Sequence, residues 1–259
     1  MATKLVLVTG ASSGIGAATA KRYGAAGAHV LLLARDMGRL EDVSAAIRAS
    51  GGSASPYAVD LAEAEAVSAV SEEITTAHGT PDILINNAGA GSWLSILDTS
   101  PADARAMMAV PYLAAFYVSR AFLPGMVARK SGRIACITSP AAYFAWPNAC
   151  AYIAARHAMK GFAEAMRADL RGTGVSVTLV VLGTVETPYW EHNPGSREHL
   201  PPTNPRLVPN LTPEEAATAI VEGTEHRQRT VIKPGIFRAI FIANALFPRF
   251  VAGQLRKKG

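Results

Sequence analysis

The chain has 259 residues, of which 49% are hydrophobic and 17% charged. This composition fits one large globular α/β domain and excludes a disordered chain. With only two cysteines, we expect neither a disulfide framework nor a metal site. The net charge of +5 suits an anionic cofactor, and its scatter along the chain argues against nucleic acid as a partner.

The apolar runs of the sequence are short. None reaches the roughly 18 residues that a transmembrane helix needs. The run 5–8 near the N-terminus is shorter than the apolar core of about 7–15 residues in a signal peptide. We therefore interpret it as a first strand and expect a cytoplasmic protein.

Seven β-branched or Leu-rich runs alternate with Ala-rich helical stretches. The runs are too continuously apolar for a sheet with one solvent-exposed face, so we expect parallel strands with helices on both faces. Helices should begin at Ser100 and at Thr212, each followed by proline and acid. The predicted fold is α/β, a doubly wound, mostly parallel, seven-stranded sheet of the Rossmann type, with residues 1–259 as a single domain. The predicted strands are 4–8, 29–33, 54–59, 83–86, 133–138, 175–182 and 230–232.

A glycine-rich turn, Thr9-Gly10-Ala11-Ser12-Ser13-Gly14-Ile15-Gly16, follows the first predicted strand and opens a helix. Glycines permit a tight turn and a close approach to a pyrophosphate, and the helix N-terminus supplies N–H groups and a positive dipole end. The alternative is an ordinary strand-to-helix turn. The position of the glycine-rich turn within a complete βαβ unit favours a dinucleotide site.

The end of the second predicted strand bears on the identity of the dinucleotide. A carboxylate at position 34 would bind the adenosine ribose 2′-hydroxyl, but this position is Ala34. Arg35 can bind a 2′-phosphate instead, so we expect NADP(H) rather than NAD(H). Two alternatives remain open: Arg35 could pair with Asp36 or Glu41 on the surface, or Asp36 could itself face the ribose.

The segment 188–210 carries six prolines and shows neither helical nor strand periodicity. It contains Tyr189, Trp190, His192 and His199. A loop of this length inside a compact domain is usually functional or disordered. Because it follows the sixth strand on the ligand-binding side of the sheet, we predict a substrate lid.

Taken together, these motifs resemble the short-chain dehydrogenase/reductase family over nearly the whole chain. The glycine-rich turn matches the family pattern TGxxxGxG, and 86–89 matches its NNAG segment. Asp60 resembles the family's adenine-binding acid, and 185–187 resembles the segment that holds the nicotinamide carboxamide. The resemblance implies a cofactor site comprising Gly10, Ser12, Ser13, Gly14, Ile15, Gly16, Arg35, Asp60, Leu61, Asn87, Ala88, Gly89, Tyr152, Arg156, Val185 and Thr187.

The resemblance also implies a reaction. Ser139 and Tyr152 stand 13 residues apart, as the family's catalytic serine and tyrosine usually do. Tyr152 would donate a proton to a substrate carbonyl as hydride arrives from NADPH, or remove one in reverse, and Ser139 would hydrogen-bond the same oxygen. A phenol needs a nearby cation to act at neutral pH. Taken singly, Tyr152 could be a buried helix tyrosine and Ser139 a turn residue.

Two positions depart from the family pattern. Arg156 replaces the lysine four residues after the tyrosine, and Pro111 replaces the asparagine of a proton relay. Arg156 shares a helix face with Tyr152 and completes the predicted catalytic set, whereas Lys160 lies a further turn along. Pro111 offers no donor and should kink its helix. We expect an active enzyme with a modified relay; the alternative is a catalytically weak NADP(H)-binding regulatory or partner protein.

The residues expected near the nicotinamide are apolar or aromatic, which favours a lipophilic ketone, aldehyde or alcohol as substrate. Alternatively, several of them only pack the lid. They are Trp93, Ala142, Tyr143, Trp146, Leu182, Tyr189 and Trp190.

The C-terminal segment 236–259 is apolar and ends in the basic tail Arg256-Lys257-Lys258. We expect it to be buried within a homo-oligomer. It could also cover the pocket, or lie on a membrane surface with the tail as an anchor. The family resemblance suggests a homodimer or homotetramer joined through helices containing 104–123 and 152–170.

Overall fold

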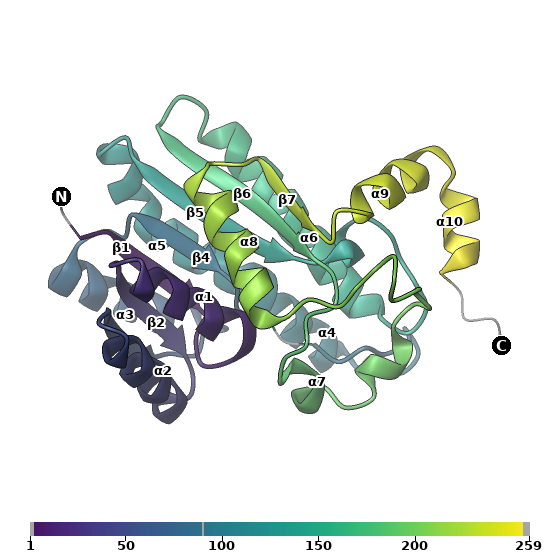
Figure 1. Cartoon of the computed structure of the whole chain (residues 1–259), viewed down its shortest axis with the longest axis horizontal. Coiled ribbons are helices and arrows are strands. Elements are labelled where there is room, and N and C mark those ends of the chain that lie inside the picture. Colours follow the sequence, from purple (N-terminus) through teal and green to yellow (C-terminus); the bar gives the residue numbers. More distant parts are fainter. Residues whose placement is uncertain (1–2, 90, 256–259) are drawn as a thin grey trace.

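The seven predicted strands form one sheet in the computed structural model, which describes residues 3–89 and 91–255 and only the backbone of His192. All strands are parallel, in the order β3-β2-β1-β4-β5-β6-β7 (Figure 1). Every strand ends within one residue of the predicted boundary, and the Rossmann-type sheet is confirmed. The strands are β1 (Leu5–Thr9), β2 (His29–Ala34), β3 (Ser53–Ala58), β4 (Ile83–Asn86), β5 (Gly132–Thr138), β6 (Val175–Leu182) and β7 (Thr230–Lys233).

Helices cover both faces of this sheet (Figure 1). One layer contains α1 (Gly14–Ala25), α2 (Met37–Ala49) and α8 (Pro213–Glu225), and the other contains α3 (Ala64–His78), α5 (Ala114–Ala128) and α6 (Cys150–Asp169). Successive strand residues point to opposite layers: Val6 and Val8 belong to the first core, and Leu7 to the second. This burial on both faces explains the continuous apolar runs in the sequence.

Both predicted helix starts are capping boxes. The Ser100 side chain caps α4 (Pro101–Met108), and the Thr212 side chain caps α8. Between α4 and α5 the chain forms a π-helical turn, Ala109–Leu113, which contains the buried Pro111. A proline cannot donate the usual helical hydrogen bond, so the predicted kink takes the form of this wider turn.

The helical stretch Pro101–Ala128 is long and apolar enough to cross a membrane by length and composition. Its inner side chains, however, pack into the core beneath the sheet: Ala114, Val118, Phe122 and Met126 are all buried there. We therefore assign it as a core helix of the α/β fold.

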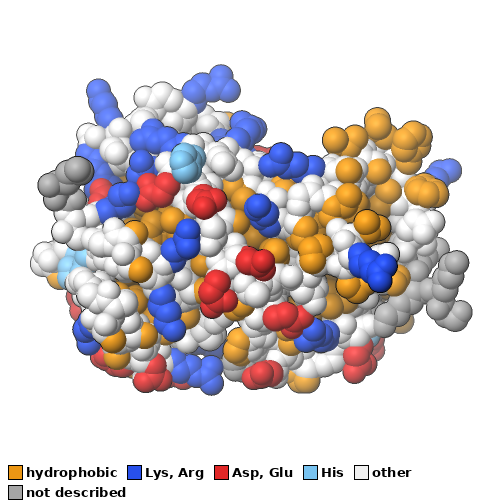
Figure 2. Space-filling model, in the orientation of Figure 1, with side chains coloured by type: hydrophobic (Ala, Val, Ile, Leu, Met, Phe, Trp, Pro, Cys, Tyr) orange, Lys and Arg blue, Asp and Glu red, His pale blue; other side chains and the backbone are white. Residues whose placement is uncertain are grey.

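Two short helices follow the last strand and extend beyond the edge of the sheet, α9 (Phe237–Leu246) and α10 (Pro248–Gln254) (Figure 1). Only Phe237 and Val251 are buried in them. Figure 2 shows hydrophobic side chains gathered on their outer surface. The segment 188–210, predicted as a lid without periodic structure, contains two short helical elements: α7 (Tyr189–His192) and a 3-10 turn, Ser196–His199.

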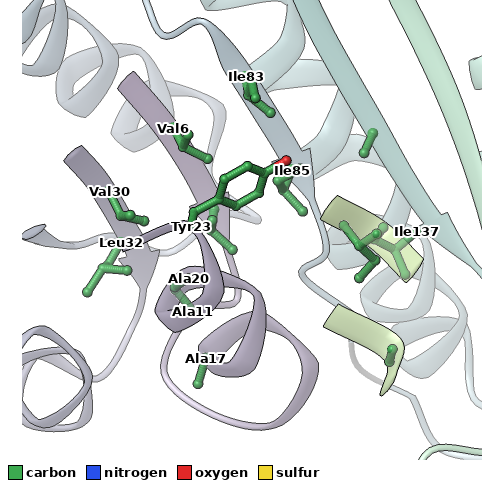
Figure 3. Close-up of a cluster of buried hydrophobic side chains, with 14 of the residues drawn as sticks. Val6, Ala11, Ala17, Ala20, Tyr23, Val30, Leu32, Ile83, Ile85 and Ile137 are labelled. Atoms are coloured by element: carbon green, nitrogen blue, oxygen red, sulfur yellow. The ribbon is translucent and has the colours of Figure 1, made fainter. Parts of the chain in front are cut away.

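Small residues allow α1 to lie close against the sheet. Gly16, Ala17 and Ala20 are buried on its inner side. Tyr23, the large exception, places its ring among Val6, Ile83 and Ile85 over β1 and β4 (Figure 3). This close packing fixes the first turn of α1 relative to the end of β1.

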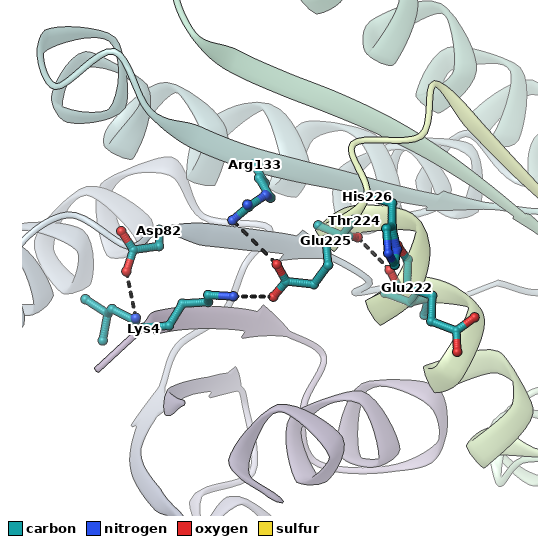
Figure 4. Close-up of polar contacts among 9 residues, drawn as sticks. Lys4, Asp82, Arg133, Glu222, Thr224, Glu225 and His226 are labelled. Atoms are coloured by element: carbon teal, nitrogen blue, oxygen red, sulfur yellow. Dashed lines mark hydrogen bonds and ion pairs between the residues drawn. The ribbon is translucent and has the colours of Figure 1, made fainter. Parts of the chain in front are cut away.

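An ionic cluster joins β1, β5 and α8 at the opposite end of the strands from the glycine-rich turn (Figure 4). Glu225 accepts from the Lys4 Nζ at 2.6 Å and lies 3.5 Å from the Arg133 Nη1. The Glu225 side chain is only 26% exposed, so its charge is partly shielded from water.

We predict that Glu225→Gln lowers the free energy of unfolding by about 1 kcal/mol, because two half-buried cations lose their counter-charge. Denaturant unfolding measures this change. The control is Glu222→Gln on the same helix: Glu222 is 61% exposed and only 4.0 Å from Arg22, so its loss should cost less than about 0.5 kcal/mol. Equal effects of the two substitutions would contradict the role assigned to the cluster.

Candidate active site

The site lies at the carboxyl ends of β1 and β4, where the strand order reverses. Thr9 ends β1 and is nearly inaccessible. Its Oγ1 accepts from the backbone N–H groups of Asn87 and Ala88, both at 3.0 Å. The Asn87 side chain donates back to the Thr9 carbonyl at 3.0 Å. These bonds hold the glycine-rich turn and the NNAG segment on either side of one crevice.

Glycine is required at three positions of the turn. Gly10 and Gly14 have φ of +65° and +52°, and a Cβ on Gly10 would lie 2.9 Å from the Ala88 Cα. A Cβ on Gly16 would lie 2.1 Å from the Gly10 carbonyl oxygen. The backbone therefore folds into a cradle that side chains would fill.

One cavity of about 1350 Å³ connects the predicted cofactor and catalytic residues. Gly16 is the exception: it is buried behind the turn and closes it. The predicted residues that line the cavity are Gly10, Ser12, Ser13, Gly14, Ile15, Arg35, Asp60, Leu61, Asn87, Ala88, Gly89, Ser139, Tyr152, Arg156, Val185 and Thr187.

The end of β2 shows how Arg35 and Asp36 are engaged. Asp36 caps α2 by accepting from the Arg39 N–H at 3.1 Å, and its other oxygen lies 3.4 Å from the Arg39 Nε. Arg35 lines the cavity and makes no ion pair with any described residue. The Asp36 carboxylate is thus bound to Arg39, and the Arg35 guanidinium beside Ala34 is available to bind an anion.

The predicted catalytic pair is assembled from two elements. Ser139 follows β5 and caps a short 3-10 turn, Pro140–Ala142, while Tyr152 lies in the first turn of α6. The Tyr152 hydroxyl donates to the Ser139 Oγ at 3.2 Å. Tyr152 is only 7% exposed. The hydroxyl groups of these two residues, 13 positions apart in sequence, thus lie side by side in the cavity.

Arg156 lies one turn further along α6 and is also buried. Its Cζ stands 4.8 Å from the Tyr152 ring centroid, a cation–π geometry. The Nε has no hydrogen-bond partner in the part of the chain that the structure describes. Lys160 cannot take its place, because it pairs with Glu164 at 3.3 Å and lies over Tyr143 instead.

Aromatic side chains form the wall beside Tyr152. The Trp93 ring lies 4.7 Å from that of Tyr152 and contacts Trp146 and Trp190. Two pocket predictions were wrong: Ala142 is packed inside, and Tyr143 stacks on Phe241 of α9 at 3.9 Å, so neither lines the cavity. Phe144 also lines the cavity, although it was not predicted to do so. The alternative that the C-terminal segment covers the pocket fits five further lining residues of α9 and α10: Phe237, Ile240, Ala243, Phe250 and Val251.

The segment after β6 is hydrogen-bonded to the loop after β4. Asn193 accepts from the Gly91 N–H at 3.1 Å, and Ser196 accepts from the Trp93 N–H at 3.2 Å. Tyr189 accepts from the Trp93 indole at 3.1 Å. Burial and the neighbouring Tyr152 raise the pKa of Tyr189 well above its ordinary value, so its phenol stays neutral. These contacts fix the aromatic wall.

The chemistry of this site fits a dinucleotide. The glycine cradle leads into a helix N-terminus, Arg35 supplies a cation, and the buried Arg156 Nε is a donor without a partner among the described residues. The described residues contain no cluster of three His, Cys, Asp or Glu side chains that could hold a metal. Fold and site together define a Rossmann-type, nucleotide-binding oxidoreductase with a Ser–Tyr pair.

The family model for short chain dehydrogenases matches residues 4–197, and the chain belongs to this family of oxidoreductases. It is 36% identical to a fatty acyl-CoA reductase of Acinetobacter baylyi over 88% of this chain and 75% of the relative. A metagenomic short-chain oxidoreductase solved with NADP is 32% identical, with a TM-score of 0.75 over 88% of this chain and 96% of the other. A short-chain dehydrogenase from Burkholderia phymatum, solved with NAD, shares the fold at 24% identity and a TM-score of 0.85 over 96% and 95% of the two chains.

We predict that Gly16→Ala weakens NADPH binding about tenfold or more and lowers the free energy of unfolding by about 1–3 kcal/mol, because the added methyl would push on the Gly10 carbonyl. Quenching of tryptophan fluorescence and denaturant unfolding measure the two effects. The matched control is Gly161→Ala in α6, where a Cβ meets nothing within 4 Å. Wild-type NADPH affinity in Gly16→Ala would contradict the proposed cradle.

Proposed function

We propose that the chain is an NADP(H)-dependent oxidoreductase that interconverts a carbonyl and an alcohol on a lipophilic small molecule, with a modified proton relay. The observation that carries this proposal is the 3.2 Å hydrogen bond between Tyr152 and Ser139, with a buried guanidinium against the same phenol. When bound, the nicotinamide supplies or accepts the hydride.

The cofactor would lie along the sheet edge with its pyrophosphate on the glycine cradle. Arg35 would bind the 2′-phosphate, since no carboxylate stands at position 34 and Asp36 is engaged by Arg39. Asp60 and Leu61 would contact the adenine, and Val185 and Thr187 the carboxamide. Arg156 would donate to the nicotinamide ribose through its unpartnered Nε or its terminal nitrogens.

Proton transfer would take place at the Tyr152 Oη. Ser139 would hydrogen-bond the substrate oxygen and hold it within reach of the phenol. The Arg156 guanidinium would place a positive charge against the phenol ring, and because a guanidinium offers only hydrogen-bond donors, another group would carry the proton. Since Pro111 provides no side-chain donor, water in the cavity would resupply the proton.

The apolar wall supports the proposed substrate class. Trp93, Trp146, Trp190 and Phe144 line the same cavity as the Ser139–Tyr152 pair. The name of the Acinetobacter relative, a fatty acyl-CoA reductase, supports a lipophilic carbonyl. We further propose a cytoplasmic homodimer or homotetramer joined through α4–α5 and α6, whose outer face exposes Phe116.

We predict that Arg35→Ala raises the KM for NADPH about ten- to hundredfold and leaves the KM for NADH nearly unchanged, because a charge-assisted bond to the 2′-phosphate is lost. Initial rates with each cofactor measure this. Arg22→Ala, on the outer side of α1, is the control and should change neither constant. A parallel loss with both cofactors would show that Arg35 does not select the phosphate.

We predict that Tyr152→Phe lowers kcat about a hundredfold or more while NADPH still binds, since the ring remains and only the proton donor is removed. NADPH oxidation with a panel of lipophilic ketones and aldehydes measures turnover, and Tyr117→Phe on α5 serves as the control. If the wild type binds NADPH tightly but is inactive with every substrate, and Arg156→Lys gains turnover, the chain is instead a weak enzyme acting as a cofactor-binding regulator.

A further inference from the structure

The outer surface of α9 and α10 is the largest concentration of exposed apolar side chains among the described residues. We call it the C-terminal apolar surface and define it as Ile242, Leu246, Phe247 and Phe250, which are 63%, 67%, 64% and 68% exposed. Figure 2 shows hydrophobic side chains gathered in this part of the molecule. Monomeric globular proteins rarely leave such a patch uncovered, so it marks an interaction surface.

The opposite side of α9 is anchored to the fold. Phe241 stacks on Tyr143 at 3.9 Å with an interplanar angle of 7°, and the Asn244 side chain donates to the Tyr143 carbonyl at 3.0 Å. Phe237 is buried and packs against Phe144 and Phe241. Because these contacts fix the inner face of the helix, the outer apolar face cannot turn inward without breaking them.

Charge indicates the kind of partner. From Ile236 to the C-terminus the sequence holds five Lys or Arg residues, at 238, 249 and 256–258, and no Asp or Glu. In Figure 2, Lys or Arg side chains stand at the margin of the apolar area. Two copies of the chain meeting here about a two-fold axis would bring like charges together. A bilayer with anionic headgroups complements both the apolar side chains and the positive margin.

We propose that the C-terminal apolar surface binds the interfacial region of an anionic lipid bilayer, with α9 and α10 lying on the membrane. Phe250 belongs to this surface and also lines the cavity. Ile240 and Ala243 of α9 line the cavity as well. The same cavity contains Tyr152 and Ser139. A lipophilic substrate therefore reaches the catalytic pair from the bilayer, a consequence that rests on the proposed function.

The test uses the full chain and vesicles of phosphatidylcholine with or without phosphatidylglycerol. Wild type should cosediment with the anionic vesicles, bind neutral ones far less, and dissociate as salt rises. The variant Ile242→Gln with Leu246→Gln removes two apolar contacts that do not line the cavity, and its binding should fall about tenfold or more. Lys257→Gln with Lys258→Gln should weaken only the binding to anionic vesicles.

The matched control is Ile96→Gln with Leu97→Gln, two side chains 70% and 93% exposed on a different loop, which should bind as wild type does. Absence of vesicle binding, or equal binding by the Ile242/Leu246 variant, overturns the proposal. So does a wild-type dimer that this variant splits in sedimentation velocity, which would identify a second copy as the partner. Reduction of a water-soluble aldehyde with NADPH should persist in every variant; its absence in wild type would count against the proposed function and not against this surface.

Discussion

The structure depends on the contact between Thr9 and Asn87 where β1 and β4 separate. These neighbouring strands lead to helices on opposite faces, so their ends leave a crevice that no side chain of the sheet fills. The Thr9 Oγ1 satisfies three backbone groups at this point: it donates to the Ile85 carbonyl and accepts from the N–H groups of Asn87 and Ala88. These hydrogen bonds fix the width of the crevice between the two strand ends. Gly16 can pack against the back of the glycine-rich turn only because it lacks a Cβ.

Arginine in place of lysine changes the catalytic end of the crevice in a specific way. Residues four apart on α6 place the guanidinium over the phenol ring, against Gly89, where a Cβ would come within 3.1 Å of the Arg156 Nη2. A planar guanidinium can stack on an aromatic face, whereas an ammonium is a compact point charge. A guanidinium offers only hydrogen-bond donors, so Arg156 would contribute charge and hydrogen bonds while another group carries the proton.

Local patterns predicted much of this molecule. Strand ends followed from continuous apolar runs. The cofactor and catalytic residues stay a prediction, made from the turn, the NNAG segment, the 13-residue interval and the family resemblance, and all of them except Gly16 line one cavity. The pocket wall was less accessible. Tyr143 was misplaced because the 3-10 turn after Ser139 directs it toward Phe241. The C-terminal segment was assigned to the cavity only as an alternative, because the contacts that anchor α9 join residues about 100 positions apart. Such contacts leave no periodic signal in either segment.

The central claim is that the Arg156 guanidinium makes Tyr152 an effective acid and base. The most direct test is kcat for NADPH-dependent carbonyl reduction by wild type, Arg156→Gln and Arg156→Lys, measured at one pH. We predict that Arg156→Gln lowers kcat about tenfold or more, because the positive charge beside the phenol is lost, and that Arg156→Lys retains most of the wild-type kcat. Equal kcat values for wild type and Arg156→Gln would contradict this claim.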